Sequence, residues 1–363
     1  MRTFLSYVRH NFRHTVSVVC SVLMLSTTGL PKLYADITPI VKVENIRRIK
    51  HNGEHNSFTD LCRFKGDYYL GYRSCPDGHM VHPTSTIIIM KSSDTKNWKQ
   101  VCRFNVPKRD VRDPHFLVFQ NKLFVYTGTW YCGDSSPESF DMNEQLGYAV
   151  WSKNGKDWSA PIMLEGTYGH YTWRAAPYGG KAYLCGRRKH EFSAKSRSED
   201  RGMIESAMLV SDDGLIFKTA ALFQERDGDE TAFQFEPDGS VVAVARRGRG
   251  IAEICRSKPP YTEWKRQDLD RYIGGPLLAK WDGRYVVGGR KNDNGTYVTS
   301  LYWLISETEL IEFATLPSAG DNSYPGLVET GPKKALISWY SSHEKDADGN
   351  TITAVYLADL VIE

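Results

Sequence analysis

Apolar and polar positions along the chain follow a unit that recurs six times. Each unit has a polar start, an apolar strand, a turn containing Gly, Asp or Asn, and a second apolar strand that often ends in Arg. The six copies span residues 58–73, 111–130, 171–188, 229–247, 274–291 and 322–340. Their turns are 44 to 59 residues apart, close to the length of one four-stranded propeller blade. The repeat predicts an all-β fold, a six-bladed β-propeller with four-stranded blades.

A second pattern runs in phase with the first. After each of the first five hairpins comes a strand and then a turn that starts with Ser and ends in an aromatic residue, namely Trp98, Trp158, Phe217, Trp264 or Phe313. In such a turn Asp or Asn can bond its own backbone, and the aromatic ring can fill the gap between neighbouring sheets. We interpret this pattern as structural.

The two ends of the chain are predicted to complete one blade. Residues 352–362 alternate as a strand does and can pair with residues 37–43 or with the strand that follows them. A ring closed in this way leaves no free edge strand for aggregation. Because no linker interrupts the pattern, we expect a single propeller domain over residues 36–363.

Residues 1–35 differ from the rest of the chain and predict a secretory signal peptide. They combine Arg2, Arg9 and Arg13 with an apolar stretch over residues 15–25 and a small residue, Ala35, at a plausible cleavage point. The alternative is an uncleaved anchor, although the apolar run is shorter than the roughly 20 residues that span a bilayer. We expect a secreted or periplasmic protein with no membrane span after the signal is removed.

Composition and charge narrow the range of partners. The formal net charge is +3 and there is no Lys/Arg run, so we expect no nucleic-acid partner. Six cysteines follow the predicted signal, several of them in apolar strand patterns where free buried thiols are commoner than disulfides. The chain has no C-x-x-C pair, nucleotide motif or phosphate-binding glycine loop, so we predict no cofactor and no metal ligands. A structural divalent cation near the channel stays open as an alternative.

Residues able to do chemistry gather at the starts of the first strands, which line the channel of a propeller and meet at one rim. Aligning the units on their turns places six residues at similar heights: Asp60, Asp113, Arg174, Glu230, Pro276 and Tyr324. The second strand of each antiparallel hairpin returns to the same rim. Its end carries further polar residues, namely Arg73, Arg187, Arg246, Arg290 and the pair His343 and Glu344. Together with Arg112 and Asp321, they predict a funnel that binds a carboxylate, a sulfate or sugar hydroxyls.

Two of the units resemble those of the sialidase, or neuraminidase, superfamily of six-bladed propellers with Asp-box turns. Residues 229–247, DETAFQFEPDGSVVAVARR, look like the blade that carries the sialidase glutamate and one substrate-binding arginine. Residues 322–340, NSYPGLVETGPKKALISWY, look like the blade of the nucleophilic tyrosine. The resemblance implies that Tyr324 is the nucleophile, that Glu230 is the base activating its phenol, and that Arg246 and Arg290 bind the substrate's carboxylate. A phenol with a pKa near 10 needs such a base at neutral pH.

Two positions depart from the sialidase pattern. The arginine expected just before the first blade's strand is replaced by Ser57, and Arg47 and Arg48 lie further upstream. The loop that holds the sialidase acid/base aspartate reads SCPDGHMVHPTS here and offers Asp77, His79 and His82. Sialic acid itself therefore does not follow from the resemblance.

A second resemblance supplies a competing mechanism. Residues 111–128, VRDPHFLVFQNKLFVYTG, resemble the Arg-Asp-Pro segment of arabinanase and xylosidase-type five-bladed propellers, which use three carboxylates. That resemblance implies Asp60 as base, Glu230 as acid and Asp113 as the group that tunes their pKa values. The alternative is that Asp60 and Asp113 only satisfy backbone N–H groups at the channel mouth.

We therefore expect a secreted glycoside hydrolase that acts on a carbohydrate, an acidic or sulfated glycan, at the propeller funnel. Two other classes of function stay open. A polysaccharide lyase would use Tyr324 or His82 as acid/base on a uronic-acid glycan. A non-catalytic propeller would bind glycans through its arginines and through aromatic residues such as Trp130 and Trp173.

Overall fold

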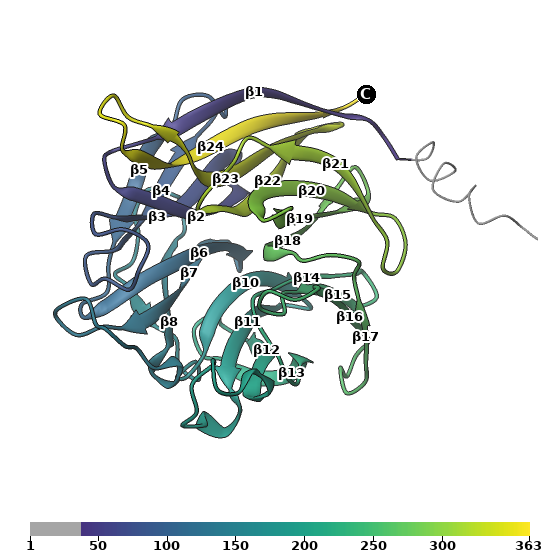
Figure 1. Ribbon diagram of the computed structural model, residues 1–363. Helices are drawn as coiled ribbons and strands as arrows, with labels where there is room; N and C mark the ends of the chain where they lie inside the picture. The colour runs from purple at the N-terminus through teal and green to yellow at the C-terminus, as the bar shows by residue number, and fades with distance from the viewer. Residues whose placement is uncertain (1–37) are drawn as a thin grey trace, which may run out of the picture. The chain divides into compact units, whose positions relative to one another are not determined.

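The computed structural model describes residues 38–363, which form six four-stranded antiparallel sheets arranged as blades around a common axis (Figure 1). The predicted six-bladed, four-stranded architecture is confirmed. The predicted signal peptide, residues 1–35, lies outside the described residues.

The first three blades follow one another along the chain. Blade 1 contains β2 (His55–Phe64), β3 (Asp67–Cys75), β4 (Thr86–Ser92) and β5 (Lys99–Phe104). Blade 2 contains β6 (Arg109–Phe119), β7 (Lys122–Tyr131), β8 (Leu146–Ser152) and β9 (Ile162–Met163). Blade 3 contains β10 (Tyr171–Tyr178), β11 (Lys181–Lys189), β12 (Ile204–Ser211) and β13 (Lys218–Gln224).

The last three blades follow the same order and close the ring. Blade 4 contains β14 (Thr231–Phe235), β15 (Val241–Ala245), β16 (Glu253–Ser257) and β17 (Trp264–Asp268). Blade 5 contains β18 (Gly274–Trp281), β19 (Arg284–Asp293), β20 (Thr296–Leu304) and β21 (Leu310–Leu316). Blade 6 contains β22 (Asn322–Gly331), β23 (Lys334–Lys345), β24 (Thr351–Ile362) and β1 (Val41–Lys50). The outer strand β1 pairs with β24, starting from Val41 opposite Ile362, as the sequence predicts.

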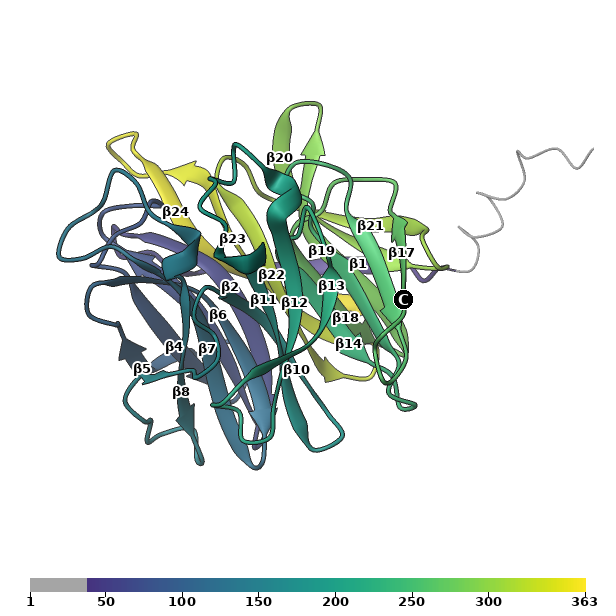
Figure 2. The ribbon, with the colours of Figure 1, turned by 90° about the horizontal axis from the view of Figure 1, so that it is seen from below.

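The long connections lie on one side of the ring. Figure 2 shows the ring from its edge, with the β7–β8 and β11–β12 connections toward the upper side. These connections carry the three short 3-10 helices of the described residues, Met142–Glu144, His190–Phe192 and Arg201–Met203. The opposite side has the turns within the hairpins, such as the one at Gly66, where φ is 88°. The funnel rim is therefore the side with room for a site.

Aromatic side chains and Ser-x-Asp turns hold the blades together. Trp281 stacks on Trp303 with ring centroids 5.5 Å apart, inside a buried cluster that joins blades 5 and 6. In the turn after β4, Asp94 Oδ1 accepts the backbone N–H groups of Lys96 and Asn97 at 2.9 and 2.8 Å. Asp213 accepts two backbone N–H groups in the same way after β12. The geometry agrees with a structural role for these turns.

Five of the six first strands contain a break in register near the rim. The breaks lie between Ser57 and Asp60 in β2, Arg112 and His115 in β6, Thr172 and Ala175 in β10, Gly274 and Leu277 in β18, and Ser323 and Gly326 in β22. A β-bulge of this kind bends the strand and re-aims its side chains. At the breaks Asp113 and Tyr324 have positive φ values of 47° and 52°.

The breaks correct the predicted alignment of the six residues. Asp113 and Tyr324 do occupy matching positions, directly after the start of the break. Asp60 lies at the position of His115, the first paired residue beyond the break, and is therefore deeper in the channel. Arg174 and Pro276 lie one residue after the Tyr324 position. The shift is visible in the spacing, because Asp60 stands six residues before its turn at Gly66 and Asp113 stands eight residues before its turn at Asn121.

Cysteine state and hydropathy add two facts about the described part of the chain. The six cysteines between Cys62 and Cys255 are all unpaired, as the preferred interpretation of the strand patterns predicts. Within residues 38–363, no helix has the length and hydropathy needed to cross a bilayer.

The close approach of first strands leads to a stability prediction. A Cβ atom on Gly326 of β22 would lie 2.5 Å from the backbone nitrogen of Leu61 in β2, whereas a Cβ on Gly331 of the same strand would meet no atom within 4 Å. We expect Gly326→Ala to lower the free energy of unfolding by about 1–3 kcal/mol, because the two blades must separate. Gly331→Ala should change it by less than about 0.5 kcal/mol. Urea unfolding of both variants checks this, and equal stability would contradict it.

Candidate active site

Tyr324, Glu230 and Arg246 form a hydrogen-bonded group at the rim, named here the tyrosine cluster. The Tyr324 hydroxyl donates to Glu230 Oε1 at 2.8 Å. Arg246 Nη1 donates to Glu230 Oε2 at 2.8 Å and also lies 3.4 Å from the Tyr324 hydroxyl oxygen. Tyr324 comes from blade 6, whereas Glu230 and Arg246 come from blade 4, so the cluster spans the channel mouth. The sequence resemblance predicted all three residues for one site.

Aromatic rings and a glycine hold Tyr324 in place. The rings of Phe58, Trp173 and Tyr340 lie 5.0, 6.1 and 6.0 Å from its ring. A Cβ on Gly275, at the matching break in blade 5, would stand 2.7 Å from the Tyr324 ring, so only glycine fits there. Burial and the nearby charge of Glu230 raise the pKa of Tyr324 well above its usual value. The phenol therefore stays protonated until a base removes its proton.

Asp229, next to Glu230, is the centre of an ion-pair network. It is fully buried, and Arg187 Nη1 donates to its Oδ1 at 2.9 Å. Arg197 pairs with Asp229 Oδ2, and Arg201 lies 3.6 Å from the same oxygen. Burial alone would raise the pKa of Asp229, but the surrounding arginines lower it well below its ordinary value. A permanently ionised Asp229 fixes the turn that presents Glu230, whose backbone N–H donates to Asp229 Oδ1 at 3.0 Å.

Asp113 is a second buried carboxyl group at the rim, and its pKa is shifted upward, whereas that of Asp229 is shifted downward. It is buried, it accepts a hydrogen bond from the Tyr171 hydroxyl, and its Oδ1 has no partner among the described residues. Burial and the charge of Glu230 raise the pKa of Asp113 to about 7, although Tyr171, Arg112 and Arg187 oppose the shift. Asp113 can therefore hold a proton at neutral pH, when Asp229 cannot.

Three arginines at the rim keep one guanidinium NH₂ group without a partner among residues 38–363: Nη1 of Arg112, Nη2 of Arg246 and Nη1 of Arg290. Each is anchored by its other nitrogens; Arg290, for example, donates to the carbonyl oxygen of Asn322 and to the Tyr340 hydroxyl. The Arg290 guanidinium lies 5.7 Å from the Tyr324 ring centroid, and that of Arg112 lies 5.8 Å from the Phe58 ring. Three anchored cations around one tyrosine can bind an anion.

A pocket of about 530 Å³ opens on the same rim, between the β7–β8 and β11–β12 connections; it contains no residue of the tyrosine cluster, but its Arg197 pairs with Asp229. Its lining includes Trp130, Phe140, Lys189 and Arg197. The Trp130 ring lies 6.1 Å from the ring of Tyr171, which bonds Asp113, so the pocket adjoins the buried carboxyl groups. A larger pocket of about 920 Å³ lies at the other end of blade 4, around the β16–β17 turn, and contains none of the cluster residues. Size alone would therefore point to the wrong end of the blade.

The structure places three predicted site residues, Asp60, Arg174 and Arg73, in contacts within the protein. Asp60 Oδ1 accepts from Arg174 Nη1 at 2.8 Å and its Oδ2 accepts the backbone N–H of Phe116 at 2.9 Å, so neither oxygen is available as a base. Arg174 also donates to the carbonyl oxygens of Pro325 and Pro276 and thereby ties three blades together. Arg73 is fully buried and bonded to Asp110 and to the carbonyl oxygens of Gly78 and Met80. The guanidinium groups of both arginines thus bond groups within the protein.

His82, His343 and Trp173 also differ from the predictions. His82 contacts the hydroxyl of Ser136 in the β7–β8 connection and has no contact with the tyrosine cluster among the described residues. The His343 ring lies 4.8 Å from the ring of Tyr356 in β24, turned toward the next strand of its own blade. Trp173 is buried beneath Tyr324, so it offers no face to a sugar.

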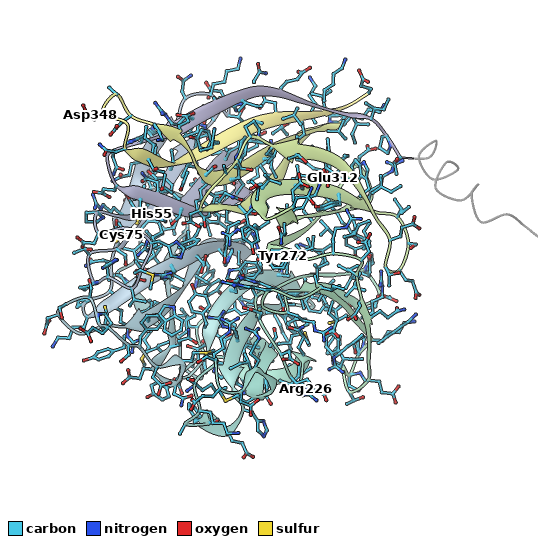
Figure 3. The ribbon with its side chains drawn as sticks, viewed as in Figure 1. His55, Cys75, Arg226, Tyr272, Glu312 and Asp348 are labelled. Carbon is cyan, nitrogen blue, oxygen red and sulfur yellow. The ribbon has the colours of Figure 1, made fainter. Side chains whose placement is uncertain are left out.

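Asp321 does reach the rim, in a group that sequence reasoning missed. Its Oδ2 lies 2.9 Å from His55 Nε2 and 2.7 Å from His79 Nδ1, and its Oδ1 accepts from the Tyr340 hydroxyl at 2.8 Å. Figure 3 labels His55 at the start of β2, toward the inner edge of blade 1. Asp229, Tyr171 and Tyr340 were missed as well. A signal did exist for Asp229 and Tyr171, because both stand at the start of a first strand, as Tyr324 does.

Comparison with known proteins identifies the fold but no family. No protein-family model matches the chain, and no curated protein matches its sequence. A protein of unknown function from Dyadobacter fermentans DSM 18053 superimposes with a TM-score of 0.73 at 18% identity, covering 90% of this chain and 100% of that one. A phage phi92 endosialidase superimposes with a TM-score of 0.63 at 10% identity, covering 88% of this chain and 69% of that one.

The structure of Trypanosoma rangeli sialidase in complex with sialic acid is also similar. Its TM-score is 0.61 at 12% identity, and the match covers 88% of this chain and 59% of the sialidase. The chain thus spans little more than half the length of that enzyme. At these identities the likeness establishes a sialidase-like propeller fold, and the chemistry has to be argued from the site.

The Asp60–Arg174 pair leads to a prediction that separates a structural arginine from a binding one. Arg174→Met would leave Asp60 ionised and buried without its cation. We expect the free energy of unfolding to fall by about 3–5 kcal/mol. As control, Arg63→Met removes an exposed guanidinium from the same channel strand as Asp60 and should change stability by less than about 0.5 kcal/mol. Equal unfolding midpoints in urea for the two variants would contradict the assigned role of Arg174.

Proposed function

We propose that this protein is a sialidase-like glycoside hydrolase that cleaves an acidic glycan with Tyr324 as its nucleophile. The observation that carries the proposal is the tyrosine cluster, in which Glu230 accepts the phenol's hydrogen bond and Arg246 bonds Glu230. A neutral phenol is a poor nucleophile, and an adjacent carboxylate is the group that activates it. The similarity to solved sialidases supports the same chemistry.

The proposed first step breaks the glycosidic bond. The Tyr324 oxygen attacks the anomeric carbon while its proton passes to Glu230 Oε1, which lies 2.8 Å away. Arg246 Nη1 bonds the other oxygen of Glu230 at 2.8 Å and holds that carboxylate in position for the transfer. The leaving oxygen takes a proton, and a sugar bound to Tyr324 remains. A water molecule then attacks the same carbon, the phenol regains its proton from Glu230, and the sugar is released.

Asp113 is the proton donor to the leaving oxygen in this proposal. A pKa of about 7 lets it carry a proton at neutral pH, as a general acid must. Its unpaired Oδ1 is free to hold that proton and, in the second step, to accept one from water. Asp77, in the loop after the first hairpin, is the competing candidate from the sialidase resemblance. Asp77 is exposed and accepts a hydrogen bond from Thr84 at 2.5 Å.

The substrate is proposed to be anionic. Arg112, Arg246 and Arg290 present unpaired NH₂ groups around Tyr324, which suits a carboxylate or a sulfate. The adjoining pocket with Trp130, Phe140 and Arg197 has room for the next part of a glycan. The signal-like segment over residues 1–35 supports a secreted or periplasmic location for such an enzyme.

A panel of acidic glycans, sialosides and uronic-acid polymers included, tests the reaction. We expect wild type to release reducing sugar without an ultraviolet-absorbing product, Glu230→Gln to lower kcat/KM by about 10²–10⁴-fold, and Tyr324→Phe to abolish turnover. Tyr302→Phe is the matched control, because it removes a buried hydroxyl that has no hydrogen-bond partner in the described structure and lies outside the site.

Each other result of the panel has a definite meaning. A product with an unsaturated sugar that absorbs ultraviolet light would show that the protein is a lyase and not a hydrolase. Binding without turnover would make the protein a glycan-binding propeller. Full activity of Tyr324→Phe, beside full activity of Tyr302→Phe, would exclude the tyrosine as nucleophile.

The pKa of Asp113 leads to a pH prediction. Because the protonated form donates, kcat/KM on a glycoside with a poor leaving group should be retained below pH 7 and fall as pH rises through about 7. Asp113→Asn should lose this limb and most of the activity, yet keep its kcat/KM on a nitrophenyl glycoside, because that value reports the first step and the leaving group needs no proton. Asp77→Asn should resemble wild type in both assays. If Asp77→Asn loses the limb instead, Asp77 is the acid.

A further inference from the structure

His55, His79 and Asp321 place three potential metal ligands at the funnel rim. His55 Nε2, His79 Nδ1 and an Asp321 carboxylate oxygen all lie within 4.8 Å of one another. The residues come from three segments: the start of β2, the β3–β4 connection and the residue before β22. Two imidazoles and one carboxylate are a ligand set that Zn²⁺ uses in catalytic sites, with a fourth position left open.

The surroundings orient these ligands. The Tyr340 hydroxyl donates to Asp321 Oδ1 at 2.8 Å, and Arg290 Nη2 lies 3.4 Å from the same oxygen, so only Oδ2 faces the histidines. Partners of this kind, bonded to the far oxygen, fix a carboxylate ligand and preserve its charge. Asp321 Oδ2 is thus held toward the two imidazoles, 2.9 Å from His55 Nε2 and 2.7 Å from His79 Nδ1, in a position to bind a cation.

The histidines combine one fixed and one accessible ligand. The side chain of His55 is only 10% exposed, whereas that of His79 is 44% exposed. Ligand atoms around tetrahedral zinc are about 3.3 Å apart, given bonds of about 2.0 Å. The present separations of 2.7 and 2.9 Å need to widen by about half an ångström, which the exposed His79 permits.

We propose that His55, His79 and Asp321 bind a divalent cation of the zinc class, with one coordination position open toward the funnel. The His79 ring lies 5.6 Å from the Phe58 ring, which in turn lies 5.0 Å from the Tyr324 ring, so the cation borders the tyrosine cluster. It would stand on the blade 1 side of the rim, where Ser57 occupies the place of an arginine. Its role toward a carboxylate or sulfate of the substrate rests on the proposed function; the binding of the metal does not.

Metal analysis of the untagged protein tests the site directly. After dialysis against micromolar Zn²⁺ and then against metal-free buffer, we expect one zinc per chain, with titration calorimetry giving the Kd. His79→Ala and His55→Ala should each weaken zinc binding by about 100-fold or more. His190→Ala is the matched control, because His190 Nδ1 also lies 2.7 Å from a carboxylate oxygen, that of Glu205, and its side chain is 57% exposed.

The outcomes separate the metal site from the enzyme. Stoichiometric zinc that His79→Ala removes and His190→Ala retains supports the site, whether or not any glycan is cleaved. Less than one tenth of a zinc per chain in wild type, or equal weakening by His79→Ala and His190→Ala, overturns it. Because His55 is the more buried histidine, His55→Ala could fail to fold, whereas His79→Ala removes an exposed side chain. Thermal unfolding of each variant shows whether it is folded, and the test then depends on His79→Ala.

Discussion

The rim of this propeller depends on one constraint: a carboxylate buried there needs a cation beside it. Removing an ionised carboxylate from water costs several kcal/mol unless a well-placed partner offsets it. The described structure meets the requirement with arginine from another strand or blade, in the pairs Asp110 with Arg73, Asp60 with Arg174, Asp229 with Arg187 and Glu230 with Arg246. At Asp113, burial and the charge of Glu230 outweigh Tyr171, Arg112 and Arg187, and the carboxyl group instead holds its proton near pH 7.

The same constraint sorts the arginines by function. The guanidinium groups of Arg73 and Arg174 donate to carboxylates and to backbone carbonyl oxygens, and these hydrogen bonds connect loops and blades. Arg246 and Arg290 are anchored on one side only, and each retains an NH₂ group facing the region of Tyr324. An arginine can bond a further molecule when one of its terminal NH₂ groups has no protein partner, irrespective of its place in the repeat.

The sequence predicted the parts of the structure that repeat. Six similar hairpins were sufficient for the blade number, and the alternation at residues 352–362 was sufficient for ring closure, because both depend on local pattern. The pair of Tyr324 and Glu230 was reached through family resemblance, and its atoms do lie in contact. Asp60 was misplaced, because it lies two residues further along its strand than Asp113 does, at the position of His115. The contact of His55, His79 and Asp321 was not predictable, since it joins segments from both ends of the chain.

Ring closure ties the candidate site to both ends of the described chain. Blade 6 is built from β1 and from β22, β23 and β24, so its sheet is complete only when Val41 of the first described strand pairs with Ile362 of the last one (Figure 1). Tyr324 stands on β22 of that blade, and Asp321 meets His55 across the seam between blades 6 and 1. The contacts of Tyr324 and Asp321 at the rim therefore depend on a strand pair, β1 with β24, that contributes no side chain to them.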